Sequence, residues 1–206
     1  IEKTRERLLA DTRTIKVTDL GAGSGSMKSS KRKVSDITRY STVPKKYGMM
    51  LSNMAEEFGK PGILEFGTSL GISAMYMAAA CPDTEVITME GCPATSEIAA
   101  ENFRMTGLDN ITLLTGSFDE LLPGVLASGS SPGLIFIDGN HRREPVIRYF
   151  NQVANISGPE SVVIIDDIHS TREMSDAWAE IRGHEKVTLT VDIFRMGMVF
   201  FRKGME

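Results

Sequence analysis

The sequence predicts an α/β fold in which a doubly wound, Rossmann-like sheet of seven mostly parallel strands is flanked by helices. From residue 62 onward, short apolar runs alternate with longer segments of helical periodicity. A glycine-containing turn at 67–71 joins the first apolar run to the helical segment that follows it. Only residues 193–195 separate the last two apolar runs, too few for a crossover, so the last strand must be antiparallel to the one before it.

The predicted strands are rich in aliphatic and β-branched residues and span 62–66, 84–89, 111–115, 133–137, 160–166, 186–192 and 196–202. The predicted helices lie between them, at 71–80, 93–106, 118–127, 143–156 and 171–183. Pro93 suits the first turn of its helix, and Ser170 or Thr171 can cap the last helix. Strands that alternate with helices in this way predict parallel neighbours and a single core.

Residues 1–60 are predicted to form an N-terminal helical and loop segment that acts as a lid over a core at 61–206. Within this segment the pattern predicts a helix at 1–11, a short strand at 14–18 and a helix at 44–58. The segment is basic, with 13 Lys and Arg against 7 Asp and Glu, whereas the rest of the chain has 10 against 20. The two parts therefore carry net charges of +6 and −10, which add up to the −4 of the whole chain.

A glycine- and serine-rich stretch at 19–26 imitates a cofactor loop, but a basic run follows it instead of an apolar helix. A flexible loop that closes over the site is the favoured interpretation. The basic cluster nearby comprises Lys28, Lys31, Arg32, Lys33, Lys45 and Lys46. It could grip a phosphorylated or nucleic-acid partner, but a solvated, mobile lid segment is the favoured interpretation. Only Tyr40 and Tyr47 interleave with these charges, so base stacking has little support and a nucleic-acid partner is not favoured.

Composition predicts one domain of 206 residues, with no apolar run near the roughly 18 residues that a membrane span needs. The two cysteines, Cys81 and Cys92, indicate a reducing compartment rather than a disulfide framework, so a cytoplasmic location is expected. The sequence leaves open whether the protein is a monomer or a homodimer.

The most informative motif is Glu65-x-Gly67-x-x-x-Gly71, at the predicted first strand-to-helix turn of the core. Glycines there let the backbone approach a ligand closely. Glu90 ends the next predicted strand, 23 positions after Gly67, near the roughly 20 at which a ribose-binding acid is expected in such a unit. No third glycine follows within the turn, which argues against a pyrophosphate-binding dinucleotide site.

This motif resembles the first motif of the class I S-adenosylmethionine (SAM)-dependent methyltransferases, especially the small catechol-type O-methyltransferases. The resemblance implies backbone contacts from the loop to the methionine part of SAM, ribose binding by Glu90 and an adenine contact at Ser117. Phe118 would pack near the adenine ring, and Glu65 would support the loop or the SAM amino group. The implied cofactor residues are Glu65, Gly67, Ser69, Gly71, Glu90, Ser117, Phe118 and Asp138.

Three carboxylates follow two neighbouring predicted strands: Asp138, Asp166 and Asp167. Such hard oxygen ligands suit Mg²⁺, Mn²⁺ or Ca²⁺. The catechol-type enzymes hold their metal with an Asp and an Asp-Asn pair at these positions, so Asp167 replaces the amide. The alternative is that Asp167 caps the following turn while Asp138 orders loops or holds the SAM amino group.

The acceptor hydroxyl must lose a proton during methyl transfer to oxygen. In the catechol-type enzymes a lysine three residues after the strand-four Asp removes it, and His141 stands at that position here. Histidine exchanges protons near neutral pH, so His141 with Asp138 is the predicted catalytic pair. The change from lysine puts the substrate in doubt. His169 is a second candidate base, and for both histidines a helix-cap or loop role is the alternative.

A closer resemblance, to a family of class I methyltransferases common in Bacteroidetes, covers nearly the whole chain. It rests on the motifs at 137–145, 163–170 and 196–202, with Met174 and Trp178 between them. This resemblance strengthens the predicted fold and cofactor and says little about the acceptor.

The sequence thus predicts a SAM-dependent methyltransferase that methylates oxygen of a small molecule, with help from a divalent metal. Two alternatives stay open at this point. A nicotinamide-dependent oxidoreductase would use the same fold and Glu90, and a SAM-binding protein without turnover would use the same cofactor loop.

Overall fold

The computed structural model describes residues 1–18, 30–127, 129 and 131–202, and its central feature is a seven-stranded sheet. The strands lie in the order β5-β4-β3-β6-β7-β9-β8. Their bounds are β3 Ile63–Phe66, β4 Val86–Glu90, β5 Ile111–Thr115, β6 Leu134–Ile137, β7 Val162–Ile165, β8 Leu189–Asp192 and β9 Gly197–Phe200. Only β9 opposes the others, since it pairs antiparallel with both β7 and β8. The predicted fold class is confirmed, with the last strand inserted between β7 and β8.

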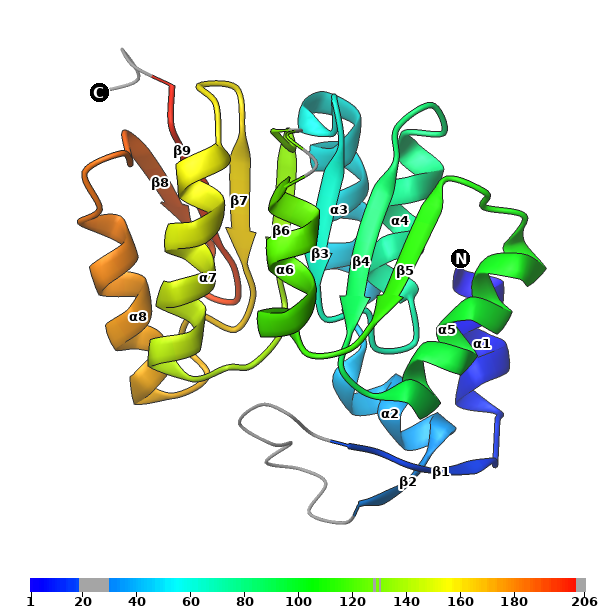
Figure 1. Cartoon of the computed structure of the whole chain (residues 1–206). Coiled ribbons are helices and arrows are strands. Elements are labelled where there is room, and N and C mark those ends of the chain that lie inside the picture. The colour runs from blue at the N-terminus through cyan, green and yellow to red at the C-terminus, as the bar shows by residue number, and fades with distance from the viewer. Residues whose placement is uncertain (19–29, 128, 130, 203–206) are drawn as a thin grey trace.

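Helices cover both faces of this sheet (Figure 1). The core helices are α4 Ile72–Ala80, α5 Pro93–Thr106, α6 Phe118–Ala127, α7 Arg143–Ile156 and α8 Arg172–Arg182. Strand residues alternate between the two faces, as the pleat requires. Along β6, for example, Leu134 and Phe136 pack with α3, α4 and α5, whereas Ile135 and Ile137 pack with α7 and α8. Burial on both faces explains why the core strands are apolar runs without alternation.

The N-terminal segment contains more regular structure than the sequence predicts. Its elements are α1 Glu2–Leu9, β1 Thr14–Lys16, β2 Lys31–Lys33, α2 Val34–Ser41 and α3 Lys45–Phe58. Part of the basic cluster, Lys31–Lys33, forms β2, which pairs antiparallel with β1 and leads directly into α2. The glycine-rich stretch at 19–26 and Lys28 lie outside the described residues.

The N-terminal helices are packed into the core. Leu8 of α1, Ile37 of α2 and Leu51 of α3 are buried in the same cluster as residues of β3 and β6. The β1–β2 pair lies beyond the carboxyl ends of the central strands (Figure 1). No helix in the part of the chain that the structure describes is long and apolar enough to cross a membrane.

Candidate active site at the carboxyl ends of the strands

The turn between β3 and α4 requires glycine at two positions. Gly67 (φ +98°) and Gly71 (φ +84°) have left-handed backbone conformations that favour glycine. A Cβ at Gly67 would clash with the carbonyl oxygen of Asp138, and one at Gly71 would clash with the ring of Phe103. These glycines therefore let the turn lie directly against the end of β6 and against α5.

Glu90 at the end of β4 fixes this turn from the side. Its Oε2 accepts a hydrogen bond from the backbone N–H of Ser69 at 2.7 Å, and its Oε1 accepts one from the N–H of Cys92 at 2.8 Å. Hydrogen bonds to an ionised carboxylate are stronger than neutral ones. Glu90 therefore ties the glycine turn to the beginning of the segment that leads into α5.

Glu65 lies beneath the turn and is fully buried. The hydroxyl of Thr88 donates to its Oε2 at 2.5 Å, and the hydroxyls of Thr88 and Thr68 are also 2.5 Å apart. Oε1 of Glu65 has no hydrogen-bond partner among the described residues. Burial raises the pKa of Glu65 to about 7, against the opposing effect of the Ser73 and Thr88 hydroxyls. Glu65 thus supports the turn through two threonines and keeps one acceptor for a ligand donor.

Asn102 of α5 is a supporting residue that sequence reasoning missed. Its buried side-chain amide donates to the carbonyl of Leu70, in the glycine turn, at 2.8 Å. Its carbonyl oxygen accepts a hydrogen bond from Arg7 of α1. The N-terminal helix is therefore linked through one side chain to the turn that is predicted to bind the cofactor.

Ser117 and Phe118 begin α6, after β5. Ser117 and Glu120 form a capping box, in which the Ser117 hydroxyl donates to Oε2 of Glu120 at 2.7 Å and accepts from the Glu120 N–H at 3.3 Å. The half-buried ring of Phe118 meets Phe66 and Tyr149 edge-on, at centroid distances of 5.5 and 5.7 Å. Phe118 therefore lines the same sheet edge as the glycine turn.

The three aspartates predicted to bind a metal follow β6 and β7, which are neighbouring parallel strands. A guanidinium lies among them. Arg195, from the turn between β8 and β9, donates from Nε to Oδ1 of Asp166 at 2.9 Å and from Nη2 to Oδ2 at 2.7 Å. Nη2 is also 3.8 Å from Oδ1 of Asp167.

The pKa values in this cluster are shifted because several carboxylates lie close together around the guanidinium of Arg195. Burial, Asp166 and Asp167 raise the pKa of Asp138, while Arg195 lowers it. Burial and then Asp166 raise the pKa of Asp167, against His141 and Arg195. Burial alone would lower the pKa of Arg195, but hydrogen bonds and charges from the aspartates outweigh it and raise that pKa. Arg195 is thus the positive charge that lowers the pKa of Asp138, and it acts together with His141 on Asp167.

The predicted metal site is not formed in this arrangement. Both carboxylate oxygens of Asp166 are bound to Arg195, so they do not face a shared position with Asp138 and Asp167. No group of three or more His, Cys, Asp or Glu side chains that could hold a metal occurs within the described ranges. The donor set that the sequence suggested is therefore occupied by a protein cation.

His141 and Asp138, the predicted catalytic pair, are brought together. Nε2 of His141 lies 3.6 Å from Oδ1 of Asp138, and the imidazole is 30% exposed. Asn140 between them has a left-handed backbone (φ +55°), and its Oδ1 is a buried acceptor that lacks a partner among the described residues. An exposed imidazole beside a carboxylate is the arrangement that a general base needs.

His169, the second candidate base, belongs to a different cluster. Its Nε2 lies 2.9 Å from Oδ2 of Asp192, which also accepts from the indole N–H of Trp178 at 3.0 Å. Trp178 is buried against Gly197, where a Cβ would clash with the indole ring. His169 and Trp178 therefore anchor the β8–β9 hairpin to α8.

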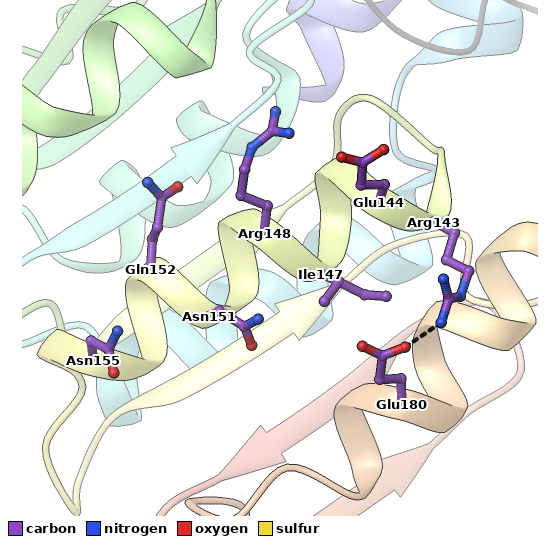
Figure 2. A pocket seen from close by; sticks show the side chains of 8 residues that line it. All are labelled: Arg143, Glu144, Ile147, Arg148, Asn151, Gln152, Asn155 and Glu180. Carbon is purple, nitrogen blue, oxygen red and sulfur yellow. Dashed lines mark hydrogen bonds and ion pairs between the residues drawn. The ribbon is translucent and has the colours of Figure 1, made fainter.

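A groove of about 360 Å³ lies elsewhere, on the outer side of α7 and α8 (Figure 2). It is lined by polar side chains of α7, such as Asn151 and Gln152, and is bordered by the ion pair of Arg143 with Glu180. None of the predicted site residues lines it. The candidate site is therefore defined by the strand ends, not by this groove.

Comparison with known proteins agrees with this geometry. The methyltransferase domain family matches residues 64–168, which run from β3 past the end of β7. A catechol O-methyltransferase of Niastella koreensis is 31% identical over 124 residues, 59% of this chain and 55% of the relative. The O-methyltransferase imqG of Aspergillus flavus is 30% identical over 146 residues, 68% of this chain and 57% of the relative. The chain thus spans little more than half the length of these curated relatives.

Solved structures show the same fold. The O-methyltransferase TomG of Streptomyces achromogenes, in complex with SAM, superposes with a TM-score of 0.69 at 22% identity, over 79% of this chain and 82% of that one. An O-methyltransferase of Bacillus cereus in complex with S-adenosylhomocysteine (SAH) gives 0.66 at 22% identity, over 77% and 82%. The resemblance to catechol-type and Bacteroidetes methyltransferases is confirmed by the family match and the Niastella relative. The chain belongs to the methyltransferase domain family and has the class I SAM-dependent methyltransferase fold.

Proposed function

We propose that this protein is a SAM-dependent methyltransferase that methylates oxygen of a small-molecule acceptor. The observation that carries the proposal is the turn between β3 and α4, which Glu90 holds through the Ser69 N–H at the carboxyl end of the sheet. In open α/β sheets ligands bind at this edge. The similarity to a catechol O-methyltransferase and to a second O-methyltransferase supports oxygen as the acceptor atom.

Two buried acceptors fit the amino group of SAM. They are Oε1 of Glu65, near the end of β3, and Oδ1 of Asn140, in the loop after the neighbouring strand β6. Neither atom has a hydrogen-bond partner among the described residues. Buried polar atoms are nearly always hydrogen-bonded, so these two acceptors favour a ligand that brings N–H donors. When bound, SAM supplies an electrophilic methyl group on a sulfonium. Glu90, Ser117 and Phe118 are the proposed contacts to the nucleoside.

His141 is the proposed base for the acceptor hydroxyl. Asp138 lies close enough to orient the imidazole and to stabilise its protonated form, and the partial exposure of His141 gives an acceptor access to it. The order of events that this pair supports is simple. The acceptor hydroxyl would lie against His141 and give its proton to the imidazole. SAM, when bound, would supply the methyl group to that oxygen, the C–S bond breaking as the C–O bond forms and SAH leaving.

The proposed role of residues 1–60 is to cover the acceptor. The N–H of Thr18, just after β1, is 3.3 Å from Sγ of Cys92, two residues beyond Glu90. The N-terminal segment therefore reaches the edge where the proposed cofactor site lies, and β1, β2 and α2 lie beyond that edge (Figure 1). A cytoplasmic location and the choice between monomer and homodimer remain predictions.

The first experiment is a calorimetric titration of SAH, with NAD as the alternative ligand. We expect SAH to bind with micromolar affinity or better, about −8 kcal/mol, and NAD not to bind. Binding of NAD alone would replace the proposal with the oxidoreductase alternative, which the family match disfavours.

A second experiment separates an enzyme from a SAM-binding protein without turnover. Methyl transfer from labelled SAM to a panel of phenols and catechols is measured for the wild type and for His141→Gln. General-base catalysis contributes about 10²- to 10⁴-fold, so the substitution should lower turnover on that scale while leaving SAH affinity unchanged. Tight SAH binding with no transfer to any acceptor would favour the non-catalytic alternative.

A further inference from the structure

We propose that Arg195 is a built-in cation that takes the place of a divalent metal, so that this site works without one. The proposal rests on the proposed function only for the identity of the site. Its physical content, that a guanidinium occupies the cation position of the aspartate cluster, stands on the contacts of Arg195 with Asp166 and Asp167.

Arg195 and Asp166 form a bidentate contact, in which one edge of the guanidinium binds both carboxylate oxygens. Asp166 is completely buried, and each of its oxygens accepts one N–H of the guanidinium, at 2.9 and 2.7 Å. This parallel pair of charge-assisted hydrogen bonds is the strongest geometry that arginine and a carboxylate form. A metal ion would need those same oxygens. Coordination at Asp166 would therefore require Arg195 to leave.

The charge of Arg195 also reaches the other two aspartates. Its Nη2 lies 3.8 Å from Asp167, and its charge acts on Asp138 in the direction that favours ionisation. One guanidinium therefore does for three carboxylates what a divalent ion would otherwise do, which is to lower their mutual repulsion. Arginine stays protonated at all working pH values, so this cation is permanent.

Arg195 is held from three directions, and this makes its removal costly. Its backbone closes the β8–β9 turn, with its N–H donating to the carbonyl of Ile193 at 2.9 Å. Its carbonyl accepts from the N–H of Ile168, beyond the acidic pair, at 3.1 Å. Its guanidinium lies over the ring of Tyr47 in α3, 5.4 Å from the centroid. The side chain is therefore placed in advance, between the sheet edge and the N-terminal segment.

A free divalent ion competes poorly with such an arrangement. Mg²⁺ gives up its water ligands reluctantly and needs near-octahedral oxygen ligands around it. If the ion displaced the guanidinium from Asp166, the positively charged Arg195 would lose its partner and lie next to a newly bound dication. Once the guanidinium is gone, both oxygens of Asp166 are released and can turn toward Asp167 and Asp138. A divalent ion should then bind there, because a buried, uncompensated charge is strongly unfavourable.

The test uses Mn²⁺ as the probe and its electron paramagnetic resonance signal, which decreases when the ion binds protein. We expect no Mn²⁺ binding by the wild type at this site and at least about a tenfold rise in Mn²⁺ affinity for Arg195→Ala. The added affinity should disappear in Arg195→Ala combined with Asp166→Asn. Arg202→Ala is the matched control, because Arg202 lies in the same terminal segment and forms only an exposed ion pair with Glu160.

Two results would overturn the proposal. One is stoichiometric Mn²⁺ binding by the wild type that is lost in Asp166→Asn, which would show that a metal displaces Arg195. The other is a folded Arg195→Ala variant with no gain in Mn²⁺ affinity, which would show that the aspartates are not a cation site. Should Arg195→Ala fail to fold, Arg195→Met gives the same test with an apolar stem kept over Tyr47.

A thermal measurement provides an independent readout. Mg²⁺ should raise the melting temperature of the Arg195 variant and not that of the wild type, with Na⁺ at equal ionic strength as the control. SAH titration of the same wild-type sample tests the proposed function separately. A wild type that binds neither Mn²⁺ nor SAH would refute the proposed function and leave the assignment of Arg195 intact.

Discussion

The two halves of the sheet edge use their acidic residues in different ways. At the end of β4, Glu90 accepts hydrogen bonds from two backbone N–H groups near it, those of Ser69 and Cys92. At the end of β7, Asp166 is neutralised by Arg195, which is 29 residues away in the chain and reaches in from another hairpin. The first acid shapes a turn, and the second is paired with a charge.

This difference explains how one sheet edge can serve two partners. Glu90 is bound by backbone N–H groups of its own βαβ unit, and its proposed role is to bind the ribose of SAM. A buried ion pair fixes geometry instead and does not necessarily add stability compared with an apolar pair. The half near β3 and β4 is therefore organised to receive a ligand, while the half near β7 is organised around its own cation.

The largest effect on stability is expected when Asp166 is removed. Asp166→Ala leaves Arg195 partly buried without its partner, and loss of one member of a buried pair typically costs about 3–5 kcal/mol in the free energy of unfolding. Urea denaturation measures the loss. Glu160→Ala, which removes the exposed partner of Arg202, is the control and should change stability by about 1 kcal/mol or less. Equal effects of the two substitutions would show that the Arg195–Asp166 pair contributes no more to stability than an exposed ion pair does.

A pH-dependent prediction tests the buried acid in the other half. The pKa of Glu65 is raised from 4.5 to about 7, so the native protein keeps a proton between these values that the unfolded chain has released. Stability should therefore fall as pH rises through this window and stay level on either side of it. Over this window the contribution of Glu65 to the free energy of unfolding should fall by at most about 3 kcal/mol.

Glu65→Gln removes this titration, so the variant should be more stable than the wild type above pH 7 and similar to it below 4.5. Chemical denaturation at several pH values measures the difference between the two proteins, in which the contribution of Asp167 cancels and that of Asp138 changes only through the charge of Glu65. A difference that does not vary with pH would show that Glu65 does not titrate in this range.

A smaller effect is expected from Glu90 on ligand affinity. Glu90→Ala removes the anchors of Ser69 and Cys92 together with the proposed ribose contact, so SAH should bind about 1–3 kcal/mol more weakly. Calorimetry measures the change. Glu85→Ala is the control, because Glu85 precedes the opposite end of β4 and its side chain accepts a hydrogen bond from the exposed Thr112. An unchanged affinity in Glu90→Ala would place the nucleoside elsewhere.

What the sequence predicts well is local. The turn from Gly67 to Gly71 and the acid at Glu90 lie in one βαβ unit, so their spacing alone indicates that they meet. The central strands β3, β6 and β7 are also predictable, because burial on both faces makes each of them a short apolar run. The helix α2 and strand β2 were missed because pairing of β2 with β1 and packing of α2 on α1, not their own composition, determine them.

The position of Arg195 could not be predicted for a similar reason. Asp138, Asp166 and Asp167 have the spacing of metal ligands, and two arginines that follow them in the chain pair elsewhere, Arg143 with Glu180 and Arg172 with Asp176. The only signal was indirect: an arginine in the short turn 193–196 between two strands, at the edge where ligands bind. Long-range pairing of this kind depends on the register of β9 between β7 and β8, which a pattern of apolar runs does not specify.

The smallest predicted effect concerns Ser117, which has two roles to separate. Its hydroxyl caps α6 with Glu120, and it is also the proposed adenine contact. Ser117→Ala and Glu120→Gln both disturb the capping box, so each should lower stability by about 1 kcal/mol. Only Ser117→Ala should also weaken SAH binding, by about 0.5–1.5 kcal/mol, because the serine oxygen has a second lone pair for the adenine amino group. Parallel denaturation and calorimetry of both variants decide the matter: equal SAH affinities would leave Ser117 as a cap alone, and the nucleoside half would then contact adenine through Phe118.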